Sequence, residues 1–326
     1  MKRVLVTGAG SFTARHLLPL LATHADAPEL LATGMTPVRA QALVVPAAVG
    51  EMGRWGNLGG CMSGAEFRAA NLANCDEAGA VVKWARPDTV FHLAGVSASA
   101  SDQCFAVNLE GTRHLLEACA RLDPPPVVLV VSSAAVYGLT APEESPVSES
   151  TPLRPLTVYG ASKAAAEILA LTLHRRGVLR VAVARPFNLI GPGLRPGLAP
   201  SDFMAQARAI RAGRSAPEIR VGTLEPRRDF VDVRDAVRAY ITIAATRSCW
   251  GQPWNIASGR PVAIGDLLTA ILRATGVEVR LVRDAARLRA VEVPEQVGDA
   301  SALARATGWS VRVTLEKSLG DMAAEV

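Results

Sequence analysis

The chain has 326 residues, of which 49% are hydrophobic and 20% are charged; this balance excludes a disordered protein and allows a sizeable buried core. The formal net charge of +5 comes from scattered basic side chains without a basic run, which disfavours nucleic-acid binding. The five cysteines include no CxxC pair and no apolar stretch reaches membrane-spanning length, so we expect a cytoplasmic protein without a disulfide framework, a metal site or a membrane partner.

The N-terminal segment predicts a strand, a glycine turn and a helix. Residues 4–6 are apolar, and apolar residues return at helical spacing between residues 12 and 21. Such a turn aims backbone N–H groups and a helix N-terminus at a pyrophosphate, although the turn alone also occurs without a ligand. Its place directly after the first strand favours a dinucleotide site. The expected contacts are Gly8, Gly10, Ser11, Phe12 and Thr13.

The next stretch bears on the choice of dinucleotide. We expect the second strand at residues 29–32 and an irregular connection over residues 37–64. The stretch 33–39 holds no Asp or Glu that could bind the ribose hydroxyls of NAD. Arg39, or Arg15 after the glycine turn, would instead meet the 2′-phosphate of NADP; either would otherwise be a solvated surface residue. The sequence therefore favours NADP and leaves NAD open.

The middle of the chain alternates between strand and helix signals. Helices are expected to end near residue 84 and to span 108–121 and 159–175, and strands are expected at 89–93, 127–131 and 178–184. Strands that are apolar on both faces indicate an α/β fold with a doubly wound parallel sheet of the Rossmann type. Beyond residue 190 the pattern becomes rich in Gly and Pro, with a further helix at 264–274. We predict a dinucleotide-binding domain over 1–186 and about 227–257, with a smaller substrate-binding region over 187–226 and 258–326.

Three side chains form a candidate catalytic group. Tyr159 and Lys163 stand four residues apart, so on a helix they share a face. A nearby ammonium lowers the pKa of a phenol, which lets Tyr159 exchange a proton near neutral pH. Ser133 follows the strand at 127–131, and sites form at the carboxyl ends of parallel strands. The Tyr-x-x-x-Lys spacing is common by chance; the order of glycine turn, strand-end Ser and helical Tyr and Lys makes it specific.

Together these residues resemble the extended short-chain dehydrogenase/reductase family, the group of sugar-nucleotide epimerases and dehydratases. The likeness covers nearly the whole chain and is carried by TGAGSF at 7–12, FHLAG at 91–95, YGASK at 159–163, RPFNLIGPG at 185–193, RDFVDV at 228–233 and WNIASG at 254–259. The resemblance implies further cofactor contacts from Asn71, Leu72, Leu93, Ala94, Gly95, Asn108, Lys163 and Pro186, and a homodimer formed through helices 108–121 and 159–175. The chain departs from the family pattern at Ser11 and Ala14, where glycines are usual, and at Asn71, where an acid is usual.

Within this family, four segments resemble the reductases of GDP-4-keto-6-deoxymannose. They are PEESPVSE at 142–149, VGTLE at 221–225, RDF at 228–230 and LRAVEVP at 288–294. The resemblance implies substrate contacts from Ser133, Asn188, Val221, Arg228, Arg289 and Glu292. Paired N–H donors suit Arg228 and Arg289 to a diphosphate, whereas their ordinary alternative is a surface salt bridge.

The residues beside Ser133 separate the reactions that this family performs. A dehydratase needs a further acid/base pair at Ala134 and Ala135, and neither side chain carries protons. We therefore expect NAD(P)H-dependent reduction of a 4-keto-6-deoxy sugar nucleotide. An NAD-dependent 4-epimerase stays open, because it uses the same Ser, Tyr and Lys. A non-catalytic dinucleotide-binding sensor is the third alternative, and it is disfavoured because Tyr159 and Lys163 are both present.

Overall fold

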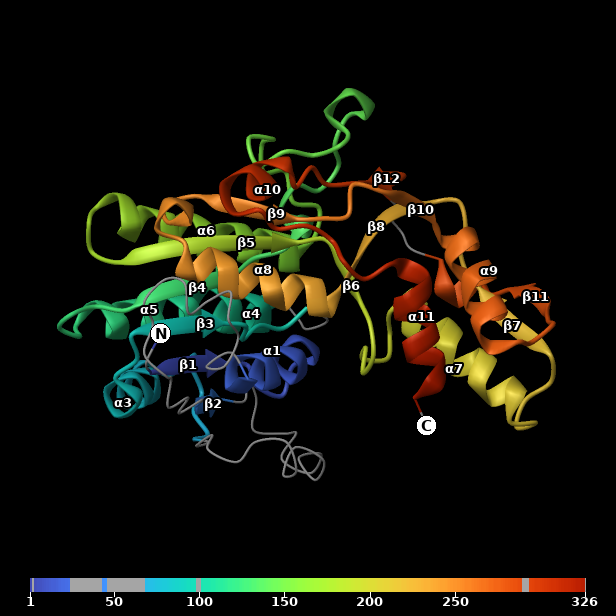
Figure 1. Ribbon diagram of the computed structural model, residues 1–326, viewed down its shortest axis with the longest axis horizontal. Coiled ribbons are helices and arrows are strands. Elements are labelled where there is room, and N and C mark those ends of the chain that lie inside the picture. Colours follow the sequence, from blue (N-terminus) through green and yellow to red (C-terminus); the bar gives the residue numbers. More distant parts are fainter. Residues whose placement is uncertain (2, 24–42, 46–67, 98–100, 289–292, 326) are drawn as a thin grey trace.

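The computed structural model describes residues 1, 3–23, 43–45, 68–97, 101–288 and 293–325. The described residues form a central parallel sheet with the strand order β2-β1-β3-β4-β5-β9 (Figure 1). Its strands are β1 (Val4–Thr7), β2 (Leu43–Val45), β3 (Thr89–His92), β4 (Val127–Val131), β5 (Arg180–Pro186) and β9 (Pro253–Ile256). The chain passes from β1 to β2 on one side and to β3 on the other. Ligands of open α/β sheets bind at such a switch point, beyond the carboxyl ends of the strands.

Helices cover both faces of this sheet. One face carries α1 (Phe12–Thr23) and α8 (Val233–Ala245), and the other carries α3 (Cys75–Ala85), α5 (Gly111–Ala120) and α6 (Val158–Arg175). Successive residues of β1 alternate between the two cores, with Val4 and Val6 in the first and Leu5 in the second. Because both faces are covered, the strands are mainly apolar and almost wholly buried, which confirms the doubly wound parallel sheet.

The second strand differs from the expectation. The strand that pairs with β1 is β2 at Leu43–Val45, in parallel register from Leu5 with Leu43 to Thr7 with Val45. Among the described residues, β2 therefore takes the place next to β1 that was expected for residues 29–32, and the connection 37–64 is not wholly irregular. Residues 29–32 and Arg39 lie outside the described residues, and Arg39 precedes β2 in the chain instead of following it. The stretch 33–39 therefore cannot supply the acid that follows the second strand, and its composition does not distinguish NADP from NAD.

The helix predicted at 108–121 begins earlier than expected. Ahead of α5 the chain forms α4 (Ser101–Cys104) and then a π-helical segment, η3 (Phe105–Glu110). Asn108 lies inside η3 and is fully buried. A π-helical turn shifts the residues of a helix relative to its regular face, and such turns are frequent at functional sites.

The remaining elements gather at the other end of the molecule, on the right of Figure 1. β8 (Arg227–Asp232) is bordered by β6 (Asn188–Ile190), β10 (Pro261–Ala263) and β12 (Glu295–Gln296), and β7 (Glu218–Val221) pairs with β11 (Arg280–Arg283). The helices here are α7 (Ala199–Arg211), α9 (Ile264–Thr275) and α11 (Leu315–Ala324). They share a core that contains Phe203, Ile219, Leu267 and Leu319. In the described ranges, no helix is both long enough and apolar enough to cross a bilayer.

Short elements complete the chain. They are the helix α10 (Ser301–Thr307) and the 3₁₀ turns η4 (Ala134–Val136), η5 (Pro142–Glu144), η6 (Arg247–Cys249) and η7 (Ala285–Arg287). η4 follows β4 directly and carries Ser133 as its N-terminal cap, whose Oγ accepts from the N–H of Ala135 at 3.2 Å. The cap places Ser133 at the carboxyl edge of the central sheet.

A buried ion pair ties the sheet to α6. Arg185 near the end of β5 forms a bidentate pair with Glu167 of α6, and both side chains are almost completely buried. The same guanidinium donates to the hydroxyl of Tyr137 at 2.7 Å, and that hydroxyl donates to Oδ1 of Asn255 at 2.6 Å. Burial of charge is costly unless the partners satisfy each other, and here every polar atom named has a partner.

Candidate active site

The glycine turn brings the ends of β1 and β3 together. Gly8 has φ of +71°, and a Cβ built on it would lie 2.6 Å from the backbone nitrogen of Ala94. Only glycine accommodates both the left-handed backbone and this close approach. The hydroxyl of Ser11 caps α1 by accepting from the N–H of Ala14 at 3.2 Å. The serine that replaces a family glycine is thus held by its own helix.

The residues around this turn fit a dinucleotide. The first turn of α1 holds no acidic side chain, so no carboxylate offsets the positive end of the helix. Gly10 is exposed, and Ser11, Phe12 and Thr13 are partly exposed at the mouth of the turn. Leu93, Ala94 and Gly95 follow β3 on the opposite side. The predicted phosphate-binding residues therefore gather at the carboxyl ends of β1 and β3, at the switch point of the sheet.

The residues predicted beside the adenine lie ahead of α3. The Asn71 side chain is exposed, and its Oδ1 accepts from the N–H of Ala73 at 3.0 Å. Leu72 is buried in the core beneath α3 and α5, and its carbonyl accepts a hydrogen bond from Nδ1 of His114 at 3.1 Å. The side chain of Asn71 can therefore contact a ligand, whereas the side chain of Leu72 packs in the core, which leaves only its backbone for such a contact.

A directional chain of hydrogen bonds connects the glycine turn to η3. The hydroxyl of Thr112 donates to the carbonyl of Asn108 at 2.6 Å, so its oxygen accepts from Nε2 of His92 at 2.8 Å. Nδ1 of His92 must then accept from the hydroxyl of Thr7 at 2.7 Å, and Thr7 accepts from the N–H of Ala94 at 3.3 Å. Burial and the Lys163 charge lower the pKa of His92 to about 3. The ring is therefore neutral, as this chain requires.

Asn108 connects the loop after β3 to helix α6. Its Oδ1 accepts from the N–H of Val96 at 2.9 Å, and its Nδ2 donates to the carbonyl of Val96 and to Oγ of Ser162, each at 2.9 Å. Ser162 in turn donates to the carbonyl of Tyr159 at 2.8 Å. Every hydrogen-bonding atom of the buried amide is used, so Asn108 positions the first turn of α6 relative to the loop after β3.

Tyr159 meets Ser133 because Gly160 allows close packing. A Cβ on Gly160 would lie 2.5 Å from the carbonyl oxygen of Ala135, so only glycine lets α6 approach the turn after β4 so closely. Burial raises the pKa of the Tyr159 phenol, while a hydrogen bond with the Ser133 side chain and the charge of Arg195 lower it, so that the net pKa lies above its ordinary value of 10.

Lys163 lies one helical turn further on and is 7% exposed. Its Nζ donates to the carbonyl of Val131 at 2.9 Å, and burial lowers its pKa to about 8. A Cβ on Gly95 would lie 3.0 Å from this Nζ, so the ammonium lies against the loop that follows β3. The sequence pointed to Lys163 as the group that lowers the pKa of Tyr159; in the structure Ser133 and Arg195 lower it.

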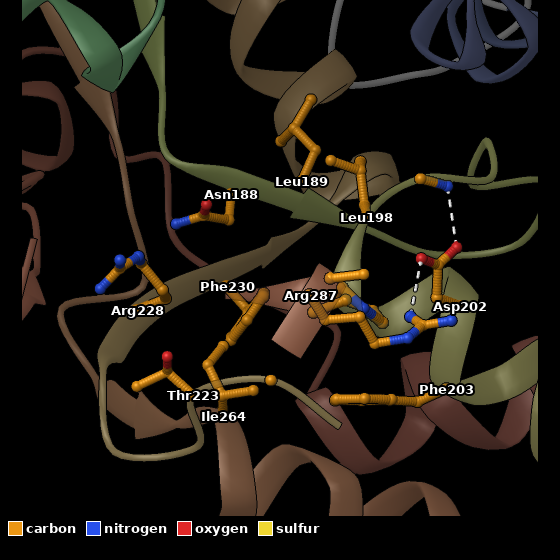
Figure 2. Close-up of a pocket in the computed structure, with 15 residues that line it drawn as sticks. Asn188, Leu189, Leu198, Asp202, Phe203, Thr223, Arg228, Phe230, Ile264 and Arg287 are labelled. Atoms are coloured by element: carbon orange, nitrogen blue, oxygen red, sulfur yellow. Dashed lines mark hydrogen bonds and ion pairs between the residues drawn. The ribbon is translucent and has the colours of Figure 1, made fainter. Parts of the chain in front are cut away.

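A pocket of about 400 Å³ opens in the second region, which comprises the elements β6, β7, β8, β10, β11, β12, α7, α9 and α11 (Figure 2). Asn188 and Arg228 lie on one side of it, and Asp202 and Arg287 lie on the other. Phe203, Phe230 and Ile264 supply apolar lining. The amide of Asn188 donates to the carbonyl of Asp229 at 2.9 Å, and Arg228 donates to the carbonyl of Val293 at 2.7 Å.

Two predicted substrate contacts lie outside the described residues, and a third lies behind the pocket. Arg289 and Glu292 are not described. The Val221 side chain packs in the core of the second region, and the two residues after it, Gly222 and Thr223, line the pocket instead. Pro186 is buried at the end of β5, two residues before Asn188. The chain from β5 to β6 therefore links the carboxyl edge of the central sheet to the pocket.

Three polar side chains of the site were not expected from the sequence. Asp202 and Arg287 line the pocket, and Arg195 donates to Oγ of Ser97 at 2.5 Å beside the catalytic group. No motif marks them, because they belong to a Gly/Pro-rich segment, a helix start and a short 3₁₀ turn that only the folded chain brings together. In the described residues, no group of three metal-ligating side chains is assembled.

Comparison with known proteins identifies the family. The model of the NAD dependent epimerase/dehydratase family matches residues 4–257. The chain is 34% identical over 238 residues to GDP-6-deoxy-D-mannose reductase of Pseudomonas aeruginosa, covering 72% of this chain and 78% of the relative. It is 31% identical over 216 residues to UDP-glucose 4-epimerase of Mycolicibacterium smegmatis, covering 65% and 67%. The structure of RMD from Pseudomonas aeruginosa complexed with NADPH superposes with a TM-score of 0.79 at 28% identity over 99% of this chain and 98% of that one. The chain therefore belongs to the NAD-dependent epimerase/dehydratase family, the extended short-chain dehydrogenases/reductases, and is an NAD(P)-dependent oxidoreductase of that family.

Proposed function

We propose that this protein reduces the 4-keto group of a GDP-linked 4-keto-6-deoxy sugar with NADPH. The observation that carries the proposal is the contact between Tyr159 and Ser133 at the carboxyl edge of the sheet, where Lys163 lies beside Gly95. The likeness to GDP-6-deoxy-D-mannose reductase supports the substrate, and the likeness to RMD with NADPH supports the cofactor.

The cofactor would lie along the carboxyl edge of the central sheet. The glycine turn and the start of α1 suit its pyrophosphate, and Asn71 suits its adenine. Lys163, held close to Asn108 and Gly95, suits the nicotinamide ribose. When bound, NADPH supplies the hydride for the reduction.

Tyr159 would supply the proton that reduction of a ketone requires. Its pKa is raised, so the phenol is protonated at neutral pH and can donate to the oxygen that becomes a hydroxyl. The Ser133 hydroxyl would hold the same oxygen, because it already shares a hydrogen bond with the phenol. The pair thus combines a proton donor and an orienting group at the carboxyl edge of the sheet.

Dehydration is disfavoured by the residues next to Ser133. Ala134 is buried and Ala135 is partly buried, and neither side chain can take or give a proton. The 4-epimerase alternative is supported by the likeness to UDP-glucose 4-epimerase and uses the same three side chains. Reduction and epimerisation differ in the fate of the cofactor, which makes them separable by experiment.

The diphosphate of the substrate would meet Arg228 and Asn188. Arg228 is partly exposed at the pocket, and a planar guanidinium pairs well with phosphate oxygens. Since β5 leads from Pro186 directly into Asn188, a substrate held here can extend its sugar toward the sheet edge.

The proposal is tested with purified full-length protein and a 4-keto-6-deoxy sugar nucleotide. We expect stoichiometric NADPH consumption, measured as loss of absorbance at 340 nm. Tyr159→Phe should lower turnover by at least roughly a hundredfold while NADPH still binds, because general acid catalysis contributes about that factor or more. Interconversion of UDP-glucose and UDP-galactose without net cofactor consumption would establish the epimerase instead. Cofactor binding without turnover of any sugar nucleotide would support the non-catalytic dinucleotide-binding sensor.

A further inference from the structure

The pocket contains a carboxylate and a guanidinium side by side, opposite Arg228. Asp202 lies in the first turns of α7, and its Oδ1 accepts from the N–H of Gly197 at 2.8 Å. Its Oδ2 lies 3.6 Å from Nη1 of Arg287, whose Nε lies 3.6 Å from Asp284. Both side chains are about one-third exposed, at 33% for Asp202 and 35% for Arg287. They therefore remain accessible from the pocket while their positions are set by neighbours.

The distribution of polarity across the pocket suits a nucleotide. Arg228 and Asn188 lie on the side where the proposed function places the diphosphate (Figure 2). Phe230 and Ile264 lie between the two polar ends and offer apolar surface to the faces of a heterocycle. A base attached to that diphosphate would cross this apolar stretch and present its polar edge to Asp202 and Arg287.

We propose that Asp202 and Arg287 read the Watson–Crick edge of the base and select guanine. The proposal rests on the function proposed above, because it takes the occupant of the pocket to be a sugar nucleotide. An ionised carboxylate only accepts hydrogen bonds and a guanidinium only donates them. Side by side, the pair offers one donor and then two acceptors. Guanine offers the complement in the same order: the O6 acceptor, the N1–H donor and the N2–H₂ donor.

The other common bases fail at one or more of these positions. Uracil and thymine offer an acceptor, a donor and an acceptor, so a carbonyl would face the second carboxylate oxygen. Adenine offers a donor where Arg287 also donates. Hypoxanthine matches O6 and N1–H and lacks only the N2 amine, so one acceptor of Asp202 would lose its partner. Each mismatch leaves a polar group without a hydrogen bond, which is the basis of strong discrimination.

Binding of free nucleoside diphosphates tests this assignment without any turnover. With wild-type protein and isothermal titration calorimetry, we expect GDP to bind roughly tenfold more tightly than IDP, and UDP, dTDP and ADP to bind more weakly still. This comparison needs no variant. Wild-type protein that binds IDP within twofold of GDP, or that prefers UDP, overturns the assignment.

Asp202→Asn tests the residue itself. Asparagine can still accept from the N–H of Gly197, so the start of α7 keeps its contact, but its amide presents only one oxygen. We expect GDP affinity to fall roughly tenfold and the preference for GDP over IDP to shrink toward one, because the N2 partner is lost. An equal loss for GDP and IDP would show a merely structural role and overturn the assignment. Asp266→Asn, an exposed carboxylate in the first turn of α9, is the matched control and should leave the preference unchanged.

The two proposals fail separately. Selective GDP binding that depends on Asp202, in a protein that consumes no NADPH with any 4-keto sugar, would keep the base assignment and remove the proposed reaction. If the protein reduces a 4-keto sugar but its nucleotide preference is unchanged in Asp202→Asn, the proposed reaction stands and the base assignment is overturned.

Discussion

Replacing Lys163 by Met should make the stability of this protein respond differently to pH. Lys163 is 7% exposed, and burial lowers its pKa from the ordinary value of 10.5 to about 8. At about 1.4 kcal/mol for each tenfold change, keeping this ammonium buried costs the folded state about 3 kcal/mol. Met fills a similar volume and carries no charge, so the variant avoids this cost.

The free energy of unfolding changes with pH because the folded and unfolded chains bind the Lys163 proton with different affinity. Below pH 8 both the folded and the unfolded chain hold the proton, so the full cost is present. Between pH 8 and 10.5 the unfolded chain keeps the proton that the folded chain has lost, and wild-type stability rises with pH. The variant loses the hydrogen bond from Nζ to the carbonyl of Val131, worth about 1–2 kcal/mol at every pH. Lys163→Met should therefore be more stable than wild type at pH 7 and less stable near pH 10.5.

Urea unfolding of both proteins without cofactor, followed by circular dichroism between pH 7 and 10.5, measures the difference. Above pH 8, we expect the free energy of unfolding of wild type, minus that of the variant, to increase by roughly 1.4 kcal/mol per pH unit. Lys83→Met, at an exposed lysine of α3, controls for the loss of a surface charge and should show no such gain. Parallel curves for wild type and Lys163→Met would refute the reasoning, because they would mean that Lys163 binds its proton equally in both states.

Three further substitutions test residues that set the position or the pKa of the catalytic group. Arg195→Gln removes a charge that lowers the pKa of Tyr159, so the pH at which the phenol deprotonates, read from the alkaline limb of turnover against pH, should move upward; an unchanged profile would count against this contact. Gly160→Ala places a methyl group 2.5 Å from a backbone carbonyl, so we expect a loss of about 1–3 kcal/mol in unfolding free energy together with lower turnover, and full activity would show that the close approach is unnecessary. Glu167→Gln leaves the buried Arg185 without its counter-charge and should cost about 3 kcal/mol in chemical denaturation, far more than an exposed ion pair would.

Local sequence patterns were sufficient to predict most strands of the central sheet and the helices beside it. The run at 127–131 is β4, and the Tyr-x-x-x-Lys segment begins α6 as expected. These elements are apolar on the faces that the fold buries, so the pattern along the chain already records the packing. The strand at 43–45 was not expected, because it is only three residues long and residues 30–32 form an equally short apolar run. β2 is recognised only by its pairing with β1, which is a contact between distant residues.

The catalytic residue types could also be read from the sequence, since each stands in a motif of fixed spacing. Their electrostatics could not. Whether Ser133, Arg195 or Lys163 lowers the pKa of Tyr159 depends on distances that Gly160 and the turn after β4 set in three dimensions. Likewise, only the fold shows that the imidazole of His92 is neutral and holds the glycine turn to the helix of Asn108.

The sequence by itself determined that this chain is a doubly wound α/β protein with a glycine turn and a Ser, Tyr and Lys group in the right order. Only the tertiary structure decided that Asp202 and Arg287 share a pocket with Arg228. Motifs consist of residues that are neighbours in the sequence, so they can be recognised without the structure. The pocket is built from residues up to about a hundred positions apart, on β6, α7, β8 and η7, and no periodicity along the sequence encodes which of them meet.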